Sequence, residues 1–150
     1  MDIFLFLETE QQRIEQQLDE FISSYTQMTN PKRFERASLI VDEIRRHLEH
    51  QKTLVLRISN DEKDTKFLLE SLKRREDIID AIDFLLMSHV DDVDYQDGLR
   101  RLLDRFNEHL KHYKNKLFCA FRKQLSPQEL GNLNSQATDW MLGSSFGSRF

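Results

Sequence analysis

Apolar residues recur at steps of three and four along four long stretches of this 150-residue chain, and this periodicity limits the fold more than any other feature. Such spacing keeps side chains on one face of an α-helix, so each stretch predicts a helix with a line of residues facing the core. The chain has only four glycines and two prolines, too few for a protein of many tight turns. We predict helices over residues 2–27, 31–58, 62–89 and 95–124.

Local signals mark where some helices begin. Asn30 followed by Pro31 is typical of a helix N-terminus, with a capping residue before a proline at the first helical position. Ser126-Pro127-Gln128-Glu129 is a capping box with proline at the same place, and it predicts a short fifth helix that ends near Leu142. The Gly/Ser-rich tail, residues 143–150, is predicted to be mobile.

Four amphipathic helices of similar length with short connections favour an all-α fold. We predict an up-down-up-down antiparallel four-helix bundle with the short fifth helix at its C-terminus. The chain length suits one domain, which we place at residues 1–142, followed by the tail at 143–150. In such a bundle, side chains from the middle of every helix meet in one layer of the interior.

Each predicted core-facing line contains polar residues near its middle. The lines run through Phe4, Leu7, Gln11, Ile14, Leu18, Phe21 and Tyr25; through Ile40, Ile44, His47, Gln51, Leu54, Val55 and Ile58; through Phe67 or Leu68, Leu69, Leu72, Glu76, Ile79, Ile82 or Asp83, and Leu86; and through Leu99, Leu102, Leu103, Phe106, His109, Tyr113, Leu117 and Phe121. Because the polar members fall at similar depths, we predict that Gln11, His47, Glu76 and His109 meet at a common level inside the protein.

Two of these segments resemble a known family. His47-Leu48-Glu49-His50-Gln51 precedes an apolar run, and His109-Leu110-Lys111-His112-Tyr113 is closely followed by Leu125-Ser126-Pro127-Gln128-Glu129-Leu130. They are similar to the second-helix and fourth-helix motifs of the hemerythrin family, which includes the bacterial HHE cation-binding domains. The resemblance covers nearly the whole chain. It implies a hemerythrin-like bundle, a bacterial source, and a non-haem di-iron centre that binds O₂ or senses oxygen, redox state or iron.

The chain departs from this family at most of the metal ligands that the resemblance implies. His47 and His109 match ligand histidines of the second and fourth helices. At the remaining ligand positions stand Gln51 and Tyr113 in place of carboxylates, and Gln11 and Glu76 in place of histidines. A bridged di-iron pair needs anionic carboxylates to offset two cations, and one carboxylate remains. The resemblance therefore implies a degenerate metal centre rather than an O₂ carrier.

Two interpretations of the polar residues stay open. In the first, His47, Glu76 and His109 hold a single Fe or Zn ion, since two imidazoles and a carboxylate suit either metal. Gln11 would then be a weak neutral donor, and Tyr113 a phenolate ligand for ferric iron. In the second, the residues form a metal-free hydrogen-bonded layer in which Glu76 pairs with a histidine, because an unpaired buried carboxylate is costly. Either layer suits a sensory, regulatory or binding protein.

Other features bear on activity and partners. The sequence has no Gly-rich phosphate loop and no Ser or Cys nucleophile with an obvious base, so no catalytic site is predicted. A metal-free bundle would also resemble, in architecture, the regulator of sigma D family, whose members bind an RNA polymerase sigma factor. That resemblance implies a protein partner. The net charge of −4 gives no reason to expect nucleic acid.

The chain is predicted to be cytoplasmic. A single cysteine, Cys119, excludes an internal disulfide and fits a reducing compartment. It lies in an apolar run, which predicts a packing role. The apolar start, residues 1–7, is too short for a membrane span and lacks a basic region before it.

Overall fold

The computed structural model of the protein describes residues 1–58, 65–113 and 118–147, and in these ranges the chain is helical, with no strand. The elements are α1 (Ile3–Ser24), the 3-10 turn η1 (Tyr25–Gln27), α2 (Asn30–Ile58), α3 (Thr65–Met87), α4 (Tyr95–His112), α5 (Phe118–Gln124) and α6 (Pro127–Gly147). The prediction of an all-α fold is confirmed.

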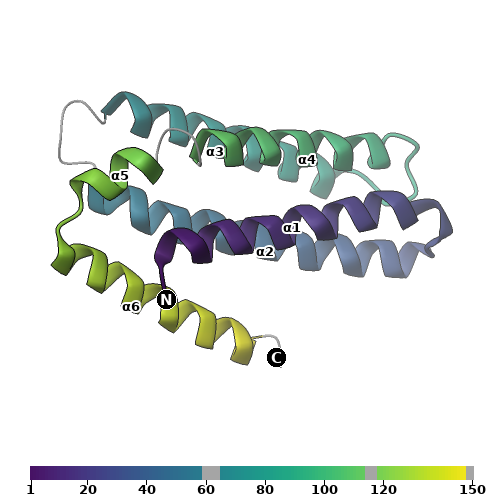
Figure 1. Cartoon of the computed structure of the whole chain (residues 1–150). Helices are drawn as coiled ribbons and strands as arrows, with labels where there is room; N and C mark the ends of the chain where they lie inside the picture. Colours follow the sequence, from purple (N-terminus) through teal and green to yellow (C-terminus); the bar gives the residue numbers. More distant parts are fainter. Residues whose placement is uncertain (59–64, 114–117, 148–150) are drawn as a thin grey trace.

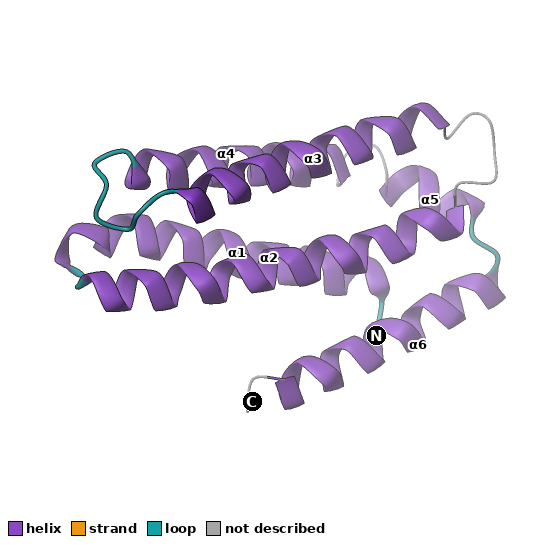
Figure 2. Ribbon diagram, turned by 180° about the vertical axis from the view of Figure 1, so that it is seen from behind, coloured by secondary structure: helices purple, strands orange, loops and turns teal. Residues whose placement is uncertain are grey.

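The long helices form two layers, each made of two helices side by side (Figures 1 and 2). One layer consists of α1 and α2, and the other of α3 and α4. Contacts between the layers run mainly from α1 to α4, while α2 and α3 touch less. The C-terminal helix α6 crosses the outer face of the first layer near the N-terminus and contacts α1.

The predicted core-facing lines of α1, α2 and α4 are confirmed for nearly every side chain that the structure describes. The buried members are Phe4, Leu7, Gln11, Ile14, Leu18, Phe21 and Tyr25 from the first line, Ile40, Ile44, His47, Gln51, Leu54 and Val55 from the second, and Leu99, Leu102, Phe106, His109, Tyr113 and Phe121 from the fourth. Leu103 is only partly buried. The polar members of these lines are as well buried as the apolar ones.

The predicted phase of α3 is wrong by about one residue, or roughly 100° of helix. Leu69, Leu72, Glu76 and Leu86 are exposed, whereas the described side chains of α3 that are buried are Ser71, Ile78, Ala81, Ile82 and Leu85. Of these, only Ile82 was among the predicted residues. Apolar residues occur in adjacent pairs along this helix, as in Ile78-Ile79 and Leu85-Leu86. The sequence therefore allows two neighbouring lines, and packing against α4 selects the one that periodicity alone did not.

Helix starts agree closely with the capping signals. The Ser126 hydroxyl accepts a hydrogen bond from the Glu129 N–H at 3.1 Å, and the Ser126 N–H donates to Glu129 Oε1 at 3.4 Å. This is the predicted capping box at the start of α6. At the start of α2 the cap is Thr29 rather than Asn30, since the Lys32 N–H donates to the Thr29 hydroxyl at 3.5 Å. That boundary lies one residue earlier than predicted.

Several predictions for the later part of the chain are wrong. In place of one helix over 95–124 there are two, α4 ending at His112 and α5 beginning at Phe118, and residues 114–117 lie outside the described ranges. The tail predicted to be mobile from residue 143 is helical as far as Gly147, and residues 148–150 lie outside. Cys119, predicted to pack, is exposed. The predicted start of the third helix, residues 62–64, also falls outside the description.

The buried hydrophobic side chains form two clusters. The main core comprises Ile14, Leu18, Phe21, Tyr25, Ile40, Val41, Ile44, Leu48, Ile78, Ala81, Ile82, Leu85, Tyr95, Leu99, Leu102 and Phe106. The terminal core comprises Ile3, Phe4, Phe6, Leu7, Leu54, Val55, Tyr113, Phe121, Leu133 and Ala137. Along α1, α2 and α4, buried polar residues lie between the two clusters and so divide the interior. Across the described ranges, no helix has the length and apolar character needed to cross a membrane.

Candidate functional site

Among the described residues, eight polar side chains are buried, and we call six of them, from α1, α2 and α4, the polar layer. It comprises Glu10 and Gln11 from α1, His47, His50 and Gln51 from α2, and His109 from α4. Each exposes less than a tenth of its surface. The structure thus brings Gln11, His47, Gln51 and His109 to one level of the interior, as the sequence pattern predicts. The layer exists because helical periodicity directs polar side chains to positions where their neighbours are apolar.

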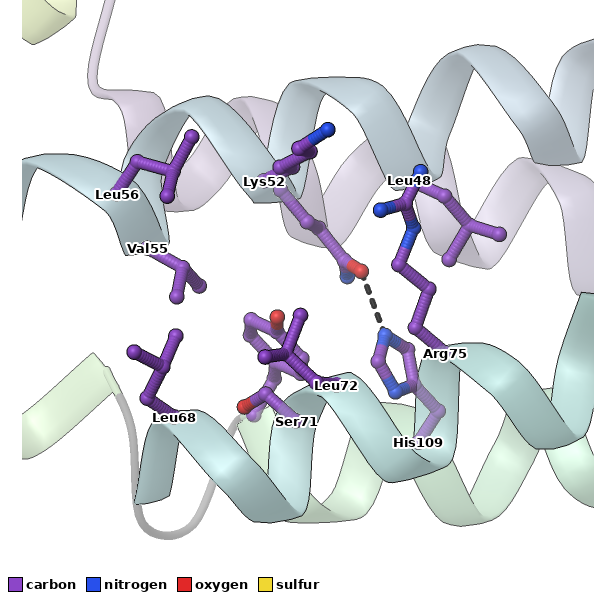
Figure 3. Close-up of a pocket in the computed structure, with 11 residues that line it drawn as sticks. Leu48, Lys52, Val55, Leu56, Leu68, Ser71, Leu72, Arg75 and His109 are labelled. Atoms are coloured by element: carbon purple, nitrogen blue, oxygen red, sulfur yellow. Dashed lines mark hydrogen bonds between the residues drawn. The ribbon is translucent and has the colours of Figure 1, made fainter. Parts of the chain in front are cut away.

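A chain of hydrogen bonds joins four of these residues, Glu10, His47, Gln51 and His109, and we call it the relay. His47 Nδ1 lies 2.6 Å from Glu10 Oε1, and His47 Nε2 lies 2.9 Å from Gln51 Nε2. Gln51 Oε1 lies 2.6 Å from His109 Nε2, the bond that Figure 3 marks with a dashed line. Gln11 stays outside the relay, because its amide donates to the Phe106 carbonyl at 3.3 Å.

The chemistry of the four groups fixes the direction of these bonds. An ionised carboxylate only accepts, so the Nδ1–H of His47 donates to Glu10 and its Nε2 is left as an acceptor. The amide nitrogen of Gln51 donates to that Nε2, and its oxygen accepts from the Nε2–H of His109. Every donor in the relay therefore points toward Glu10. Both imidazoles are neutral in this arrangement, each with a single N–H.

The carboxylate of Glu10 has a second imidazole partner. His50 Nδ1 lies 3.0 Å from Glu10 Oε1 and 3.1 Å from Oε2. The His50 ring stacks on Trp140 of α6, with ring centroids 4.2 Å apart and planes 20° from parallel, and Phe6 packs against both rings. This aromatic cover keeps water from the carboxylate and ties α6 to the polar layer.

The pKa shifts agree with this protonation pattern. Burial alone would raise the pKa of the Glu10 carboxyl, but the hydrogen bonds from His47 and His50 together with their charge lower it to about 2. Burial lowers the pKa of His47 despite the opposing effect of Glu10. Burial, with a smaller contribution from nearby cations that include Arg74 and Arg75, lowers the pKa of His109 to about 3. The carboxylate is thus charged, and the two relay histidines are neutral.

The carboxylate predicted for this site, Glu76, is not the one that the structure places there. Glu76, predicted to pair with His47 or His109, is exposed on α3 and takes no part in the polar layer, because the phase of α3 differs from the prediction. The carboxylate that pairs with His47 is Glu10. A signal for it exists in the sequence, since Glu10 lies four residues after Phe6 and four before Ile14, both apolar and both buried.

The two further histidines of the motifs are also buried. His50 contacts Glu10, as described above, and His112 Nδ1 lies 3.7 Å from Glu70 Oε2 on α3. His109 Nδ1 has no hydrogen-bond partner within the described part of the chain.

The residues do not fit the metal centre that the family resemblance implies. A metal ligand nitrogen must lie about 2.0–2.1 Å from the ion with its lone pair free. The Gln51 amide instead lies between His47 Nε2 and His109 Nε2, and it hydrogen-bonds to both. Burial raises the pKa of Tyr113 to about 12, which disfavours a phenolate ligand. No cluster of three or more His, Cys, Asp or Glu side chains within the described ranges has the geometry to hold a metal ion.

A pocket of about 90 Å³ opens between α2, α3 and α4, next to the relay (Figure 3). Gln51, His109 and Tyr113 form part of its lining. Val55 on α2 faces Leu68 on α3 across the space, and Leu56 and Leu72 also belong to the lining. The pocket exists where α3 turns the small Ser71 and the long Arg75, rather than large hydrophobic residues, toward the interior. It was not predicted, because the predicted phase of α3 placed Leu72 in the core.

Comparison of the chain with protein-family models, with curated proteins and with solved structures finds no match.

Proposed function

We propose that this protein is a hemerythrin-like bundle with a degenerate metal centre, and that it acts as a metal-independent sensory or binding protein in the cytoplasm rather than as an O₂ carrier. The observation that carries the proposal is the position of the Gln51 amide between the Nε2 atoms of His47 and His109. One amide donates to the first nitrogen and accepts from the second. Both nitrogens are therefore satisfied without a cation.

The contacts between helices support the proposed architecture. α1 touches α2 and α4, while α3 touches α4 and α2. These are the neighbours expected in an up-down-up-down antiparallel four-helix bundle. Proteins of that architecture build metal and ligand sites from side chains on facing helices in the bundle core. The relay occupies the corresponding place, with side chains from α1, α2 and α4.

Charge balance also favours a metal-free layer. The only carboxylate in the polar layer, Glu10, already accepts hydrogen bonds from His47 and His50. Binding a divalent cation through both relay histidines would require Gln51 to leave, and would add two positive charges to a buried site with one negative charge. The hydrogen-bonded arrangement avoids both costs.

The test is metal analysis of protein purified without chelator. We expect far less than one Fe or Zn per chain, and an unfolding temperature that is the same with and without EDTA. About one tightly bound ion per chain, lost in both His47→Ala and His109→Ala but retained in the exposed-site control His89→Ala, would refute the proposal. It would support a single-metal site in its place.

A protein-interaction module, like the regulators of sigma factors, is a second candidate. The second apolar line of α3 is exposed: Leu69 at 61%, Leu72 at 42% and Leu86 at 56%, and Met87 beside it is 88% exposed. Leu86 and Met87 are adjacent in sequence, and exposed apolar patches are typical of interaction surfaces. This candidate predicts that a purified sigma factor binds the protein and that Leu86→Glu abolishes binding, while Glu76→Gln, a polar change on the same exposed line, does not.

A further inference from the structure

The pocket beside the relay has apolar walls and a few polar groups. The walls are formed by Leu48, Val55, Leu56, Leu68 and Leu72. The polar and charged groups are Gln51, Lys52, Ser71, Arg75, His109 and Tyr113. Small-molecule sites in proteins commonly have this composition, with apolar surface for affinity and a few polar groups for orientation. The mixture points to a ligand that has an apolar body and a polar head.

The hydrogen-bonding groups point to a head that accepts hydrogen bonds. The Nε–H of Arg75 is buried and has no partner within the described ranges, although another nitrogen of the same guanidinium pairs with Glu49 at 2.7 Å. Ser71 is 3% exposed and adds a hydroxyl to the lining. A buried donor without a partner is costly, so an acceptor at this position would stabilise the protein.

The charges of the lining point to an anion. Among the described lining residues, only Lys52 and Arg75 have an ionised side chain, both are cations, and none is acidic. Glu49, the ion-pair partner of Arg75, is largely exposed and lies outside the lining. A carboxylate in the pocket would accept from the Arg75 Nε–H while facing net positive charge.

The volume limits the size of the apolar body. A protein cavity of about 150 Å³ holds benzene. The present pocket, at about 90 Å³, suits a smaller group. The mouth carries the exposed side chains of Leu56 and Leu72, which extend the apolar surface outward. A body of roughly three to five carbons fills such a space without crowding it.

We propose that the pocket between α2 and α3 is a binding site for a short-chain aliphatic carboxylate, with the Arg75 guanidinium holding the carboxylate and the leucine and valine walls holding the chain. The proposal deepens the proposed function, since it rests on the interpretation of the protein as a binding protein and names the class of ligand. Neighbouring His109 would report binding through its imidazole resonances.

The test is a titration of the full chain with sodium butyrate, followed by calorimetry and by NMR of the histidine rings. We expect saturable binding with a Kd of roughly millimolar, as befits a ligand of so few atoms. Butanol and butylamine, which have the same chain without the negative charge, and acetate, which has almost no chain, should bind at least tenfold more weakly. Sodium chloride at equal ionic strength should shift none of the His109 signals.

Two variants locate the site. Arg75→Gln removes the guanidinium and should weaken butyrate binding at least tenfold. Glu49→Gln breaks the same ion pair but keeps Arg75, so it should bind butyrate as the wild type does. Both residues are partly exposed, so both variants should fold, which circular dichroism checks. Equal losses in the two variants would overturn the proposal.

The remaining outcomes are also decisive. Absence of saturable butyrate binding would mean that the pocket holds only water and would overturn the proposal, as would equal affinity for butanol. The metal analysis is independent of this titration. If the protein contains a metal ion and still binds butyrate, only the proposal of metal independence is refuted. If it contains no metal and does not bind butyrate, only the proposal of a carboxylate ligand is refuted.

Discussion

The two ends of the interior are built in opposite ways. In the main core, hydrophobic side chains from all four long helices fill the space, and the Tyr25 hydroxyl at its edge donates to the Val90 carbonyl. Beyond the polar layer, the terminal core takes its side chains from α1, α2, α5, α6 and Tyr113 at the end of α4, while α3 contributes the partly buried Leu68. The pocket opens at that end. The larger hydrophobic cluster thus lies on one side of the polar layer, and the pocket opens on the other.

The largest effect should come from breaking the main core. Phe21→Ala removes a ring that is 2% exposed, and we expect it to lower the free energy of unfolding by about 3–5 kcal/mol, because the cavity collapses only in part. Phe34→Ala is the matched control, since Phe34 is 68% exposed and its loss should change stability by less than about 0.5 kcal/mol. Urea unfolding measures both. If the two variants lower the free energy of unfolding by similar amounts, packing in the main core is not a major source of stability.

Lowering the pH should destabilise the folded protein through the ionisable groups of the polar layer. Between pH 6.5 and about 3, unfolded chains protonate His109 while the folded protein keeps it neutral, so the unfolded state binds more protons and the free energy of unfolding falls as the pH falls. His47 acts in the same direction. Glu10 adds to the loss between its ordinary pKa of 4.5 and its folded pKa of about 2. At pH 5 the expected loss from His109 is on the order of 2 kcal/mol, and His47 adds a loss of the same sign.

Denaturant unfolding from pH 7.5 to 4.5 tests this expectation. The variant His109→Gln should have a shallower pH dependence than the wild type, because it removes one of the titrating groups. His89→Gln, at an exposed position, should keep the wild-type dependence. If His109→Gln and the wild type lose stability in parallel, the folded protein does not hold that histidine neutral.

A smaller effect is expected when the relay is cut at its middle. Gln51→Leu leaves His47 Nε2 without a donor and the His109 Nε2–H without an acceptor, which should cost about 1–3 kcal/mol. Gln12→Leu makes the same chemical change on the exposed face of α1 and should be nearly neutral. Urea unfolding compares them. A stability gain in Gln51→Leu would show that the relay is dispensable to the fold.

Replacing all three uncharged relay residues sharpens the comparison. Because no partner is left unpaired, a triple variant with Leu at positions 47, 51 and 109 should recover part of the stability lost in Gln51→Leu. Glu10 would still accept from His50. Recovery would indicate that the polar layer is kept for recognition rather than for stability.

Much of this fold follows from the sequence, because α1, α2 and α4 each carry one unambiguous apolar line. Their buried residues, polar ones included, are those that the spacing predicts. α3 differs because paired hydrophobic residues such as Ile78 and Ile79 give two lines of similar strength. Packing against α4 decides between the two lines, and the sequence of α3 alone does not reveal that packing.

The site was predictable in part for the same reason. His47, Gln51 and His109 lie on unambiguous lines, and they meet as expected. Glu76 was assigned through the wrong phase of α3, and the pocket was missed for that reason too. Glu10 was overlooked because it sits at the edge of its line, where periodicity alone does not separate a buried carboxylate from a solvated one. Its cover, Trp140, comes from α6 and is distant in sequence.

The uniform direction of the hydrogen bonds in the polar layer has a mechanical consequence. His109 lines the pocket, and the last acceptor, Glu10, lies beneath the stacked rings of His50 and Trp140. A tilt of the His109 ring would lengthen its bond to Gln51, and the bonds that follow connect this amide through His47 to Glu10. Hydrogen bonds thereby join the pocket lining on one side of the molecule to the carboxylate that contacts His50 beneath Trp140 of the C-terminal helix on the other.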